Sequence, residues 1–132
     1  MRQSLGLIAL ILFVAGLSFV LSAQDQPGGR AINITLTGAD PDGTATARLT
    51  FNPEKNQVCY ELTVDKIAPA KGAHIHVGTI DQSGPPVVTL TSNGCAPLEQ
   101  EKITDILKNP GNYYVDVHNS EFPNGALRAQ LK

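Results

Sequence analysis

Apolar and polar side chains alternate along most of the chain after residue 30. Apolar residues recur at every second position near residues 32–36, 45–51 and 58–64, and again near 73–77, 87–90, 113–118 and 127–131. Turns rich in glycine, proline and asparagine separate these stretches about every ten residues. Since strand side chains point alternately to opposite faces, each stretch predicts a strand buried on one face. The pattern predicts an antiparallel β-sandwich or barrel of about seven strands.

One helix is expected to interrupt the strands near residues 98–108. Ile103, Ile106 and Leu107 form an apolar stripe at helical spacing. Pro97 suits the first turn of a helix, and the segment Asn109-Pro-Gly111 suits its end. The stripe is read as the side of the helix that covers the sheet.

The N-terminal segment has the composition of an export signal. Arg2 precedes an almost uninterrupted apolar run over residues 5–21, which closes at Ser22-Ala-Gln24. We expect a signal peptide over residues 1–23, a flexible lead over 24–30 and one domain over 31–132. An uncleaved N-terminal anchor is the alternative, since the run is close to the length of a spanning helix. Either reading places the domain outside the cytoplasm, in the periplasm or secreted.

Cysteine content and charge indicate the state of the two cysteines and limit the classes of partner. Cys59 and Cys95 are the only two cysteines, and an even number in an exported domain favours a disulfide between them. The formal net charge is −2, and no basic run or aromatic–basic pattern is present. Nucleic acid is therefore a poor partner, and so is a membrane, unless the N-terminal segment stays as an anchor. An unidentified protein or small ligand is the expected partner.

The candidate chemistry lies in the histidines. His74 and His76 occupy alternate positions of one expected strand and so share a face, and His118 ends another strand whose polar face also carries Asp116. Neutral imidazoles are ligands for copper and zinc. We predict that the three imidazoles meet at one end of the sandwich and bind one such ion. The alternative is that they hydrogen-bond to strand-end carbonyls and carboxylates and only hold loops in place.

Five ordered motifs resemble one family. They are Cys59-Tyr-Glu-Leu-Thr-Val64, Gly72-Ala-His-Ile-His-Val-Gly78, Gly84-Pro-Pro-Val-Val88, Tyr113-Tyr-Val-Asp-Val-His118 and Pro123-Asn-Gly-Ala-Leu-Arg128. Together they resemble the CHRD domain, the chordin module also found as stand-alone exported microbial proteins. The resemblance covers nearly all of the chain after the lead. It implies an immunoglobulin-like β-sandwich whose biochemical role is largely unassigned.

Three functions remain open from the sequence. The leading expectation is an exported CHRD-domain binding or structural module without catalytic activity of its own. The second is a protein that binds copper or zinc through His74, His76 and His118. The third is a redox enzyme, since a His-x-His strand, a disulfide and a late strand ending in histidine also resemble copper–zinc superoxide dismutase. The chain has only three histidines, too few for the full ligand set of that enzyme. Hydrolase and phosphate-loop motifs are missing from the sequence.

Overall fold

The computed structural model describes residues 29–132. The expected signal peptide and almost all of the expected lead lie outside the described residues. The described part contains eight strands, one α-helix and one short 3-10 helix, η1. Their bounds are β1 Arg30–Leu36, β2 Thr44–Asn52, β3 Gln57–Asp65, β4 Gly72–Val77, β5 Pro86–Leu90, β6 Asn93–Pro97, α1 Gln100–Lys108, η1 Pro110–Asn112, β7 Tyr113–His118 and β8 Leu127–Gln130.

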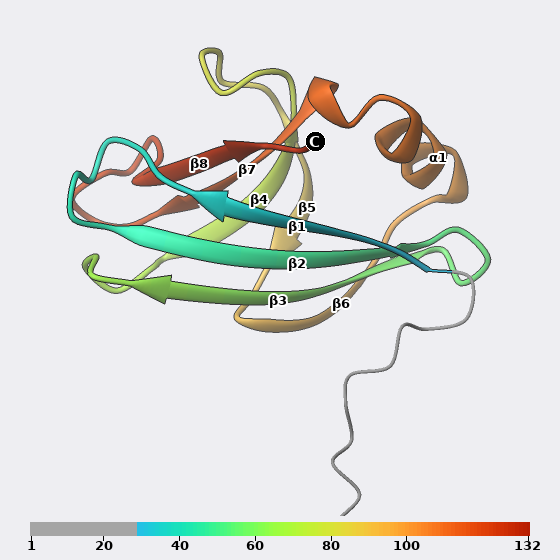
Figure 1. Cartoon of the computed structure of the whole chain (residues 1–132), viewed down its shortest axis with the longest axis horizontal. Coiled ribbons are helices and arrows are strands. Elements are labelled where there is room, and N and C mark those ends of the chain that lie inside the picture. Colours follow the sequence, from blue (N-terminus) through green and yellow to red (C-terminus); the bar gives the residue numbers. More distant parts are fainter. Residues whose placement is uncertain (1–28) are drawn as a thin grey trace, which may run out of the picture.

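The strands form two antiparallel sheets that pack face to face (Figure 1). The first sheet has the order β1-β2-β3-β6 and the second has the order β5-β4-β7-β8. A bridge between Thr37 and Arg128 ties the end of β1 to β8, so the two sheets are joined along one side. The prediction of an all-β sandwich is confirmed, with eight strands where the alternation indicated about seven.

The core is made by the inward-facing positions of both sheets. Alternate residues of β2, including Ala47, Leu49 and Phe51, are buried against alternate residues of β4 and β7, such as Ile75 and Val115. Burial of such side chains stabilises a fold by roughly 1.5–3 kcal/mol each, which makes this apolar layer the main source of stability. The same alternation sends the polar residues of β4 and β7 to the outer face of the second sheet.

Strand β6 is the one that the alternation missed. Its sequence is Asn-Gly-Cys-Ala-Pro, without regularly spaced apolar residues and with a glycine and a proline inside it. It lies at the edge of the first sheet, where a proline is tolerated. Its pairing with β3 places Cys95 directly opposite Cys59, and a disulfide joins them. The predicted disulfide is therefore confirmed.

Helix α1 closes one end of the sandwich (Figure 1). Ile103 and Ile106 are fully buried, as their spacing predicted. Pro97 lies in β6 and the helix begins only at Gln100, so the prediction that Pro97 opens the helix is wrong. Tyr113 donates a short hydrogen bond to Asp105, which fastens the helix to the start of β7.

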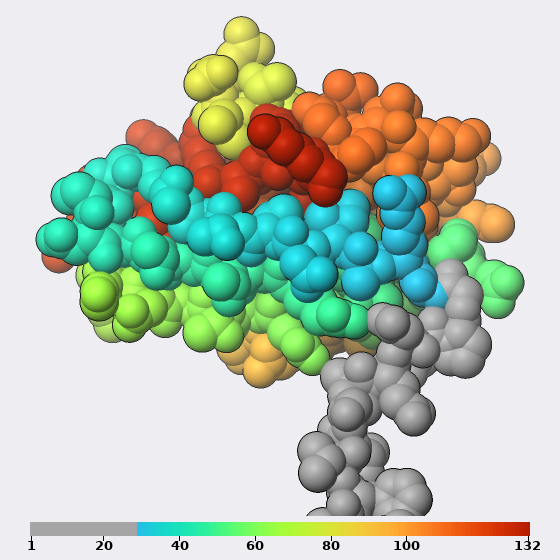
Figure 2. Space-filling model, viewed as in Figure 1, coloured from blue at the N-terminus to red at the C-terminus, as the bar shows by residue number. Residues whose placement is uncertain are grey.

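Two loops cross the outer face of the second sheet. The loop between β4 and β5 projects from the molecule, in yellow at the top of Figure 2, and the loop between β7 and β8 follows His118. Within residues 29–132 no helix has the length and apolar character needed to cross a membrane.

Candidate metal site

The polar residues of β4 and β7 meet on the outer face of the second sheet. The antiparallel register places His74 opposite Asp116, Gly72 opposite His118 and His76 opposite Tyr114. Ala73, Ile75, Val115 and Val117, which alternate with them, belong to the buried core. Strand period and register thus bring all three histidines of the chain to one side of one sheet.

Three of these side chains form a compact group of metal-ligand atoms. Nδ1 of His74 lies 3.0 Å from Nε2 of His118 and 3.6 Å from Oδ1 of Asp116. One ligand atom from each of His74, Asp116 and His118 lies within 4.8 Å of the other two. Asp116 is 4% exposed, so its carboxylate is held at the bottom of the group.

Two of the imidazoles are oriented by backbone carbonyls of the flanking loops. Nδ1 of His118 lies 3.2 Å from the carbonyl oxygen of Pro123, and Nδ1 of His76 lies 2.8 Å from that of Gly84. A carbonyl oxygen only accepts, so each Nδ1 must carry the proton and donate it. In the neutral ring Nε2 then has a lone pair: that of His118 accepts a hydrogen bond from Nδ1 of His74, and that of His76 faces Asp116.

One buried side-chain atom of His76 and one of Asp116 have no hydrogen-bond partner among the described residues. Nε2 of His76 lies 3.1 Å from Oδ1 of Asp116, but among the described residues neither atom has a hydrogen bond of acceptable geometry. Two bare acceptors this close repel each other unless a positive charge lies near them. The pair can gain that charge from a second proton on His76 or from a cation beside the carboxylate.

Electrostatics keep His74 in the form that binds metals. Burial lowers the pKa of His74 from 6.5, and the neighbouring His118 and His76 lower it further, while Asp116 acts in the opposite direction. The neutral ring is therefore favoured at neutral pH. A neutral imidazole is the form that coordinates a metal ion.

An aromatic ring and an arginine fix the closed side of the group. The ring of His76 stacks on that of Tyr114, with centroids 4.8 Å apart and planes 4° from parallel. The hydroxyl of Tyr114 accepts a hydrogen bond from the amide of Gly84, and the Arg128 guanidinium lies 5.5 Å from the centre of the same ring. Arg128 also donates to the carbonyls of Ile80 and Asn124, which links the two loops.

The structure brings together the three histidines that the sequence singled out, but the tightest group differs by one residue. It contains Asp116 in addition to His74 and His118, whereas His76 is not part of it, although its Nε2 lies 3.1 Å from the same carboxylate oxygen. The sequence placed Asp116 on the same strand face as His118. The signal that it belongs to the group is the cross-strand register with His74, which alternation alone does not give.

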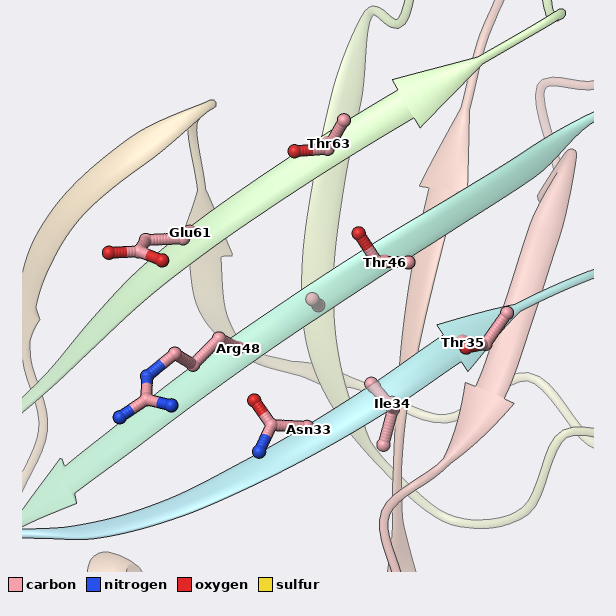
Figure 3. A pocket seen from close by; sticks show the side chains of 8 residues that line it. Asn33, Ile34, Thr35, Thr46, Arg48, Glu61 and Thr63 are labelled. Atoms are coloured by element: carbon pink, nitrogen blue, oxygen red, sulfur yellow. The ribbon is translucent and has the colours of Figure 1, made fainter.

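A second feature lies on the opposite sheet. A shallow groove of about 280 Å³ runs over the outer face of β1, β2 and β3 (Figure 3). Its lining is polar, and the register aligns Thr35, Thr46 and Thr63 in one row across the three strands. The groove contains none of the histidines, so its exposed lining residues are suitable positions for control substitutions.

Fold and site together define a small β-sandwich domain with a histidine–carboxylate group on the outer face of one sheet. The model of the CHRD domain matches residues 32–131, and the chain belongs to the CHRD domain family. No curated protein and no solved structure matches the chain. The family match covers nearly the whole sandwich.

Proposed function

We propose that this protein is an exported CHRD-domain binding module, without catalytic activity of its own, whose ligand is one copper or zinc ion. His74, Asp116 and His118 are the proposed metal ligands. The observation that carries the proposal is the buried pair of His76 Nε2 and Asp116 Oδ1, which has no hydrogen-bond partner among the described residues. The pair lies beside the ligand atoms of His74 and His118, and it is unfavourable without a positive charge.

The donor atoms fit these two metals. Nitrogen from imidazole and oxygen from a carboxylate are zinc ligands, and imidazole also suits copper. Ligand atoms that share one tetrahedral ion at about 2.0–2.2 Å lie roughly 3.3 Å apart. The separations of His74 from His118 and from Asp116, 3.0 and 3.6 Å, lie on either side of that value. The ligand atoms of His118 and Asp116 lie farther apart, within 4.8 Å, so these two side chains must approach each other to enclose an ion.

The surroundings of the ligands also support a metal. In metal sites, a histidine ligand commonly donates its other ring N–H to a neighbouring carbonyl or carboxylate. This hydrogen bond fixes the tautomer and raises the basicity of the ligand. The carbonyl of Pro123 does this for His118. We assign His76 to the same outer layer, where its ring lies against the carboxylate of Asp116 and its other nitrogen is held by Gly84.

Export is part of the proposal and has separate support. The disulfide between Cys59 and Cys95 suits an oxidising compartment, and the apolar N-terminal run suits a secretory signal. In the periplasm or outside the cell such a domain can hold or carry a metal ion, or present it to a partner.

Metal analysis of the purified protein tests the proposal. The full chain is isolated from the periplasm or medium, and its copper and zinc content is measured beside that of a variant with His74, His76 and His118 all changed to alanine. The exposed Thr63→Ala substitution, on the opposite sheet, is the control. We expect one ion per chain in the wild type and in Thr63→Ala, and none in the histidine variant. Equal metal content in all three proteins would refute the site.

A further inference from the structure

We propose that Asn119 is a positioning residue of the candidate metal site. Asn119 holds the loop after β7 in the course that brings the carbonyl oxygen of Pro123 to the ring of His118. Its effect on this ring can be measured in the metal-free protein, whereas its effect on metal binding rests on the proposed function. The burial of Asn119, its hydrogen bonds and the contact of the loop with His118 support the proposal.

Asn119 is a buried amide directly after the proposed ligand His118. It is 2% exposed and follows the last residue of β7. A buried amide without hydrogen bonds lowers the stability of a fold. Asn119 avoids this loss through three hydrogen bonds, each of them to the backbone of a loop. Its side chain therefore fixes loop backbone rather than only filling space.

The hydrogen bonds of Asn119 join two loops. Its Oδ1 accepts from the amides of Glu121 and Phe122, at 3.0 and 2.8 Å, in an Asx turn. Its Nδ2 donates to the carbonyl oxygen of Ala68 at 3.3 Å, between β3 and β4. One side chain thus bends the loop after β7 at its start and ties it to a neighbouring loop.

The bent segment leads directly to the group that orients His118. Pro123 follows Phe122 in the chain, and its carbonyl oxygen lies 3.2 Å from Nδ1 of His118. With Nδ1 as the donor, Nε2 of His118 is directed to Nδ1 of His74, 3.0 Å away. The position of Pro123 therefore decides which nitrogen of His118 is offered to the site.

Other hydrogen bonds hold the two ends of this loop. At the first end the carbonyl of His118 accepts from the amide of Lys71, and at the far end the carbonyl of Asn124 accepts from Arg128. Between these ends, the two loop amides donate to Asn119. Without this side chain they lose their acceptor, and the carbonyl that orients His118 loses its support.

The chain contains matched controls. The ring of His76 is held by the carbonyl of Gly84, in the loop between β4 and β5, so it is an internal control within each variant. Asn52 is 1% exposed, and its Oδ1 accepts from the amide of Lys55 at 3.0 Å, in the turn after β2. Asn52→Ala therefore removes the same kind of buried side chain from the other sheet.

Nuclear magnetic resonance of the metal-free protein tests the placement. Long-range ¹H–¹⁵N spectra of the full chain at mildly alkaline pH, where free imidazole is neutral, show which ring nitrogen carries the proton. We expect the proton on Nδ1 of both His118 and His76 in the wild type. Asn119→Ala should remove this preference at His118 alone, and Asn52→Ala should leave both rings unchanged. An unchanged His118 in Asn119→Ala, or an equal change in Asn52→Ala, would overturn the inference.

A conservative variant keeps the test decisive if Asn119→Ala does not fold. Asn119→Asp retains an oxygen for the two loop amides, so we expect it to keep the proton on Nδ1 of His118. Loss of that tautomer in Asn119→Asp would contradict the route through the loop. A wild-type His118 with its proton on Nε2 would overturn the proposal without any variant.

Copper titration measures the consequence for the site. Each full-length protein is titrated calorimetrically with Cu²⁺. We expect roughly tenfold weaker binding in Asn119→Ala, the lower end of the loss that follows when the support of a metal ligand is removed. Asn52→Ala should bind like the wild type. Equal affinity in all three proteins would overturn the inference and leave the proposed function standing. A wild type that binds no copper would overturn the proposed function, and the tautomer measurement would still decide the placement of His118.

Discussion

Nδ1 of His74 lies 3.6 Å from Oδ1 of Asp116, its direct cross-strand neighbour on β7. The register of β4 against β7 therefore determines whether the group exists. A slip by one residue would turn one of the two polar rows into the core, because strand side chains alternate with period two. The buried Ile75 and Val115, which pair next to them, hold this register.

The first prediction concerns the loss of a proposed ligand. His118→Ala should lower copper or zinc affinity by more than about 100-fold. Substitution of a residue that only hydrogen-bonds to a metal ligand already lowers metal affinity by roughly 10–100-fold. Calorimetric titration of the purified chain measures the affinity. Thr63→Ala, on the other sheet, should bind like the wild type. An unchanged affinity in His118→Ala would remove this residue from the ligand set.

The second prediction concerns Gly72→Ala and separates its effect on metal affinity from its effect on stability. Gly72→Ala should reduce metal affinity, because the new methyl group pushes the His118 ring away from His74. The metal-free variant should melt no lower than the wild type, since alanine lowers the backbone entropy of the unfolded chain. Thermal unfolding with and without metal measures both effects. A large drop in the melting temperature of the metal-free variant would show that residue 72 has a structural role instead.

The third prediction follows from the lowered pKa of His74. Between this lowered pKa and 6.5, the unfolded chain binds more protons at residue 74 than the folded chain does. The stability that His74 contributes is thus present above pH 6.5 and is lost as the pH falls through the folded pKa. Urea unfolding of the metal-free protein across this range should show the loss, and His74→Asn should show a smaller one. Equal pH profiles for the two proteins would contradict the assignment.

The same protons compete with the metal. Because a coordinating imidazole must be neutral, affinity for copper or zinc should fall as the pH drops below about 6.5. Binding titrations at several pH values measure this dependence. Affinity that stays constant down to acidic pH would point to a site made of carboxylates without histidine.

The fourth prediction concerns the disulfide. Cys59 and Cys95 are 36 residues apart in sequence, and closing a loop of this size stabilises a fold by roughly 4 kcal/mol in the chain-entropy model. Reduction should lower the free energy of unfolding accordingly, and intact mass should rise by two hydrogens. Two free thiols in protein isolated from its native compartment would contradict the predicted oxidised state.

The sequence predicted most of the fold because alternating burial is a local property. Strands β2 and β3, with apolar residues at every second position, could be read directly. Strand β6 could not, because its pairing with β3 is formed by backbone hydrogen bonds and a disulfide at a sheet edge. The order Asn93-Gly-Cys-Ala-Pro97 has no alternation that indicates a strand, although the predicted disulfide already linked Cys95 to Cys59.

The candidate site was predicted in part for the same reason. The His-x-His spacing fixes a shared face for His74 and His76 within one strand. The addition of Asp116 to the group, the approach of His76 to the same carboxylate and the close contact of Gly72 with the His118 ring all depend on how β4 lies against β7. That relation joins residues about forty positions apart, which a local pattern does not encode.

The order of the strands has a consequence for the biosynthesis of the protein. Strand β7, which carries Asp116 and His118, lies between β4 and β8 in its sheet. Arg128 of β8 donates hydrogen bonds to both flanking loops. The two loops beside the group can therefore be linked only after β8 has left the ribosome or the export channel. Under the proposed function, a chain that crosses a membrane unfolded would arrive without an ion. It would then take its copper or zinc from the compartment in which it folds.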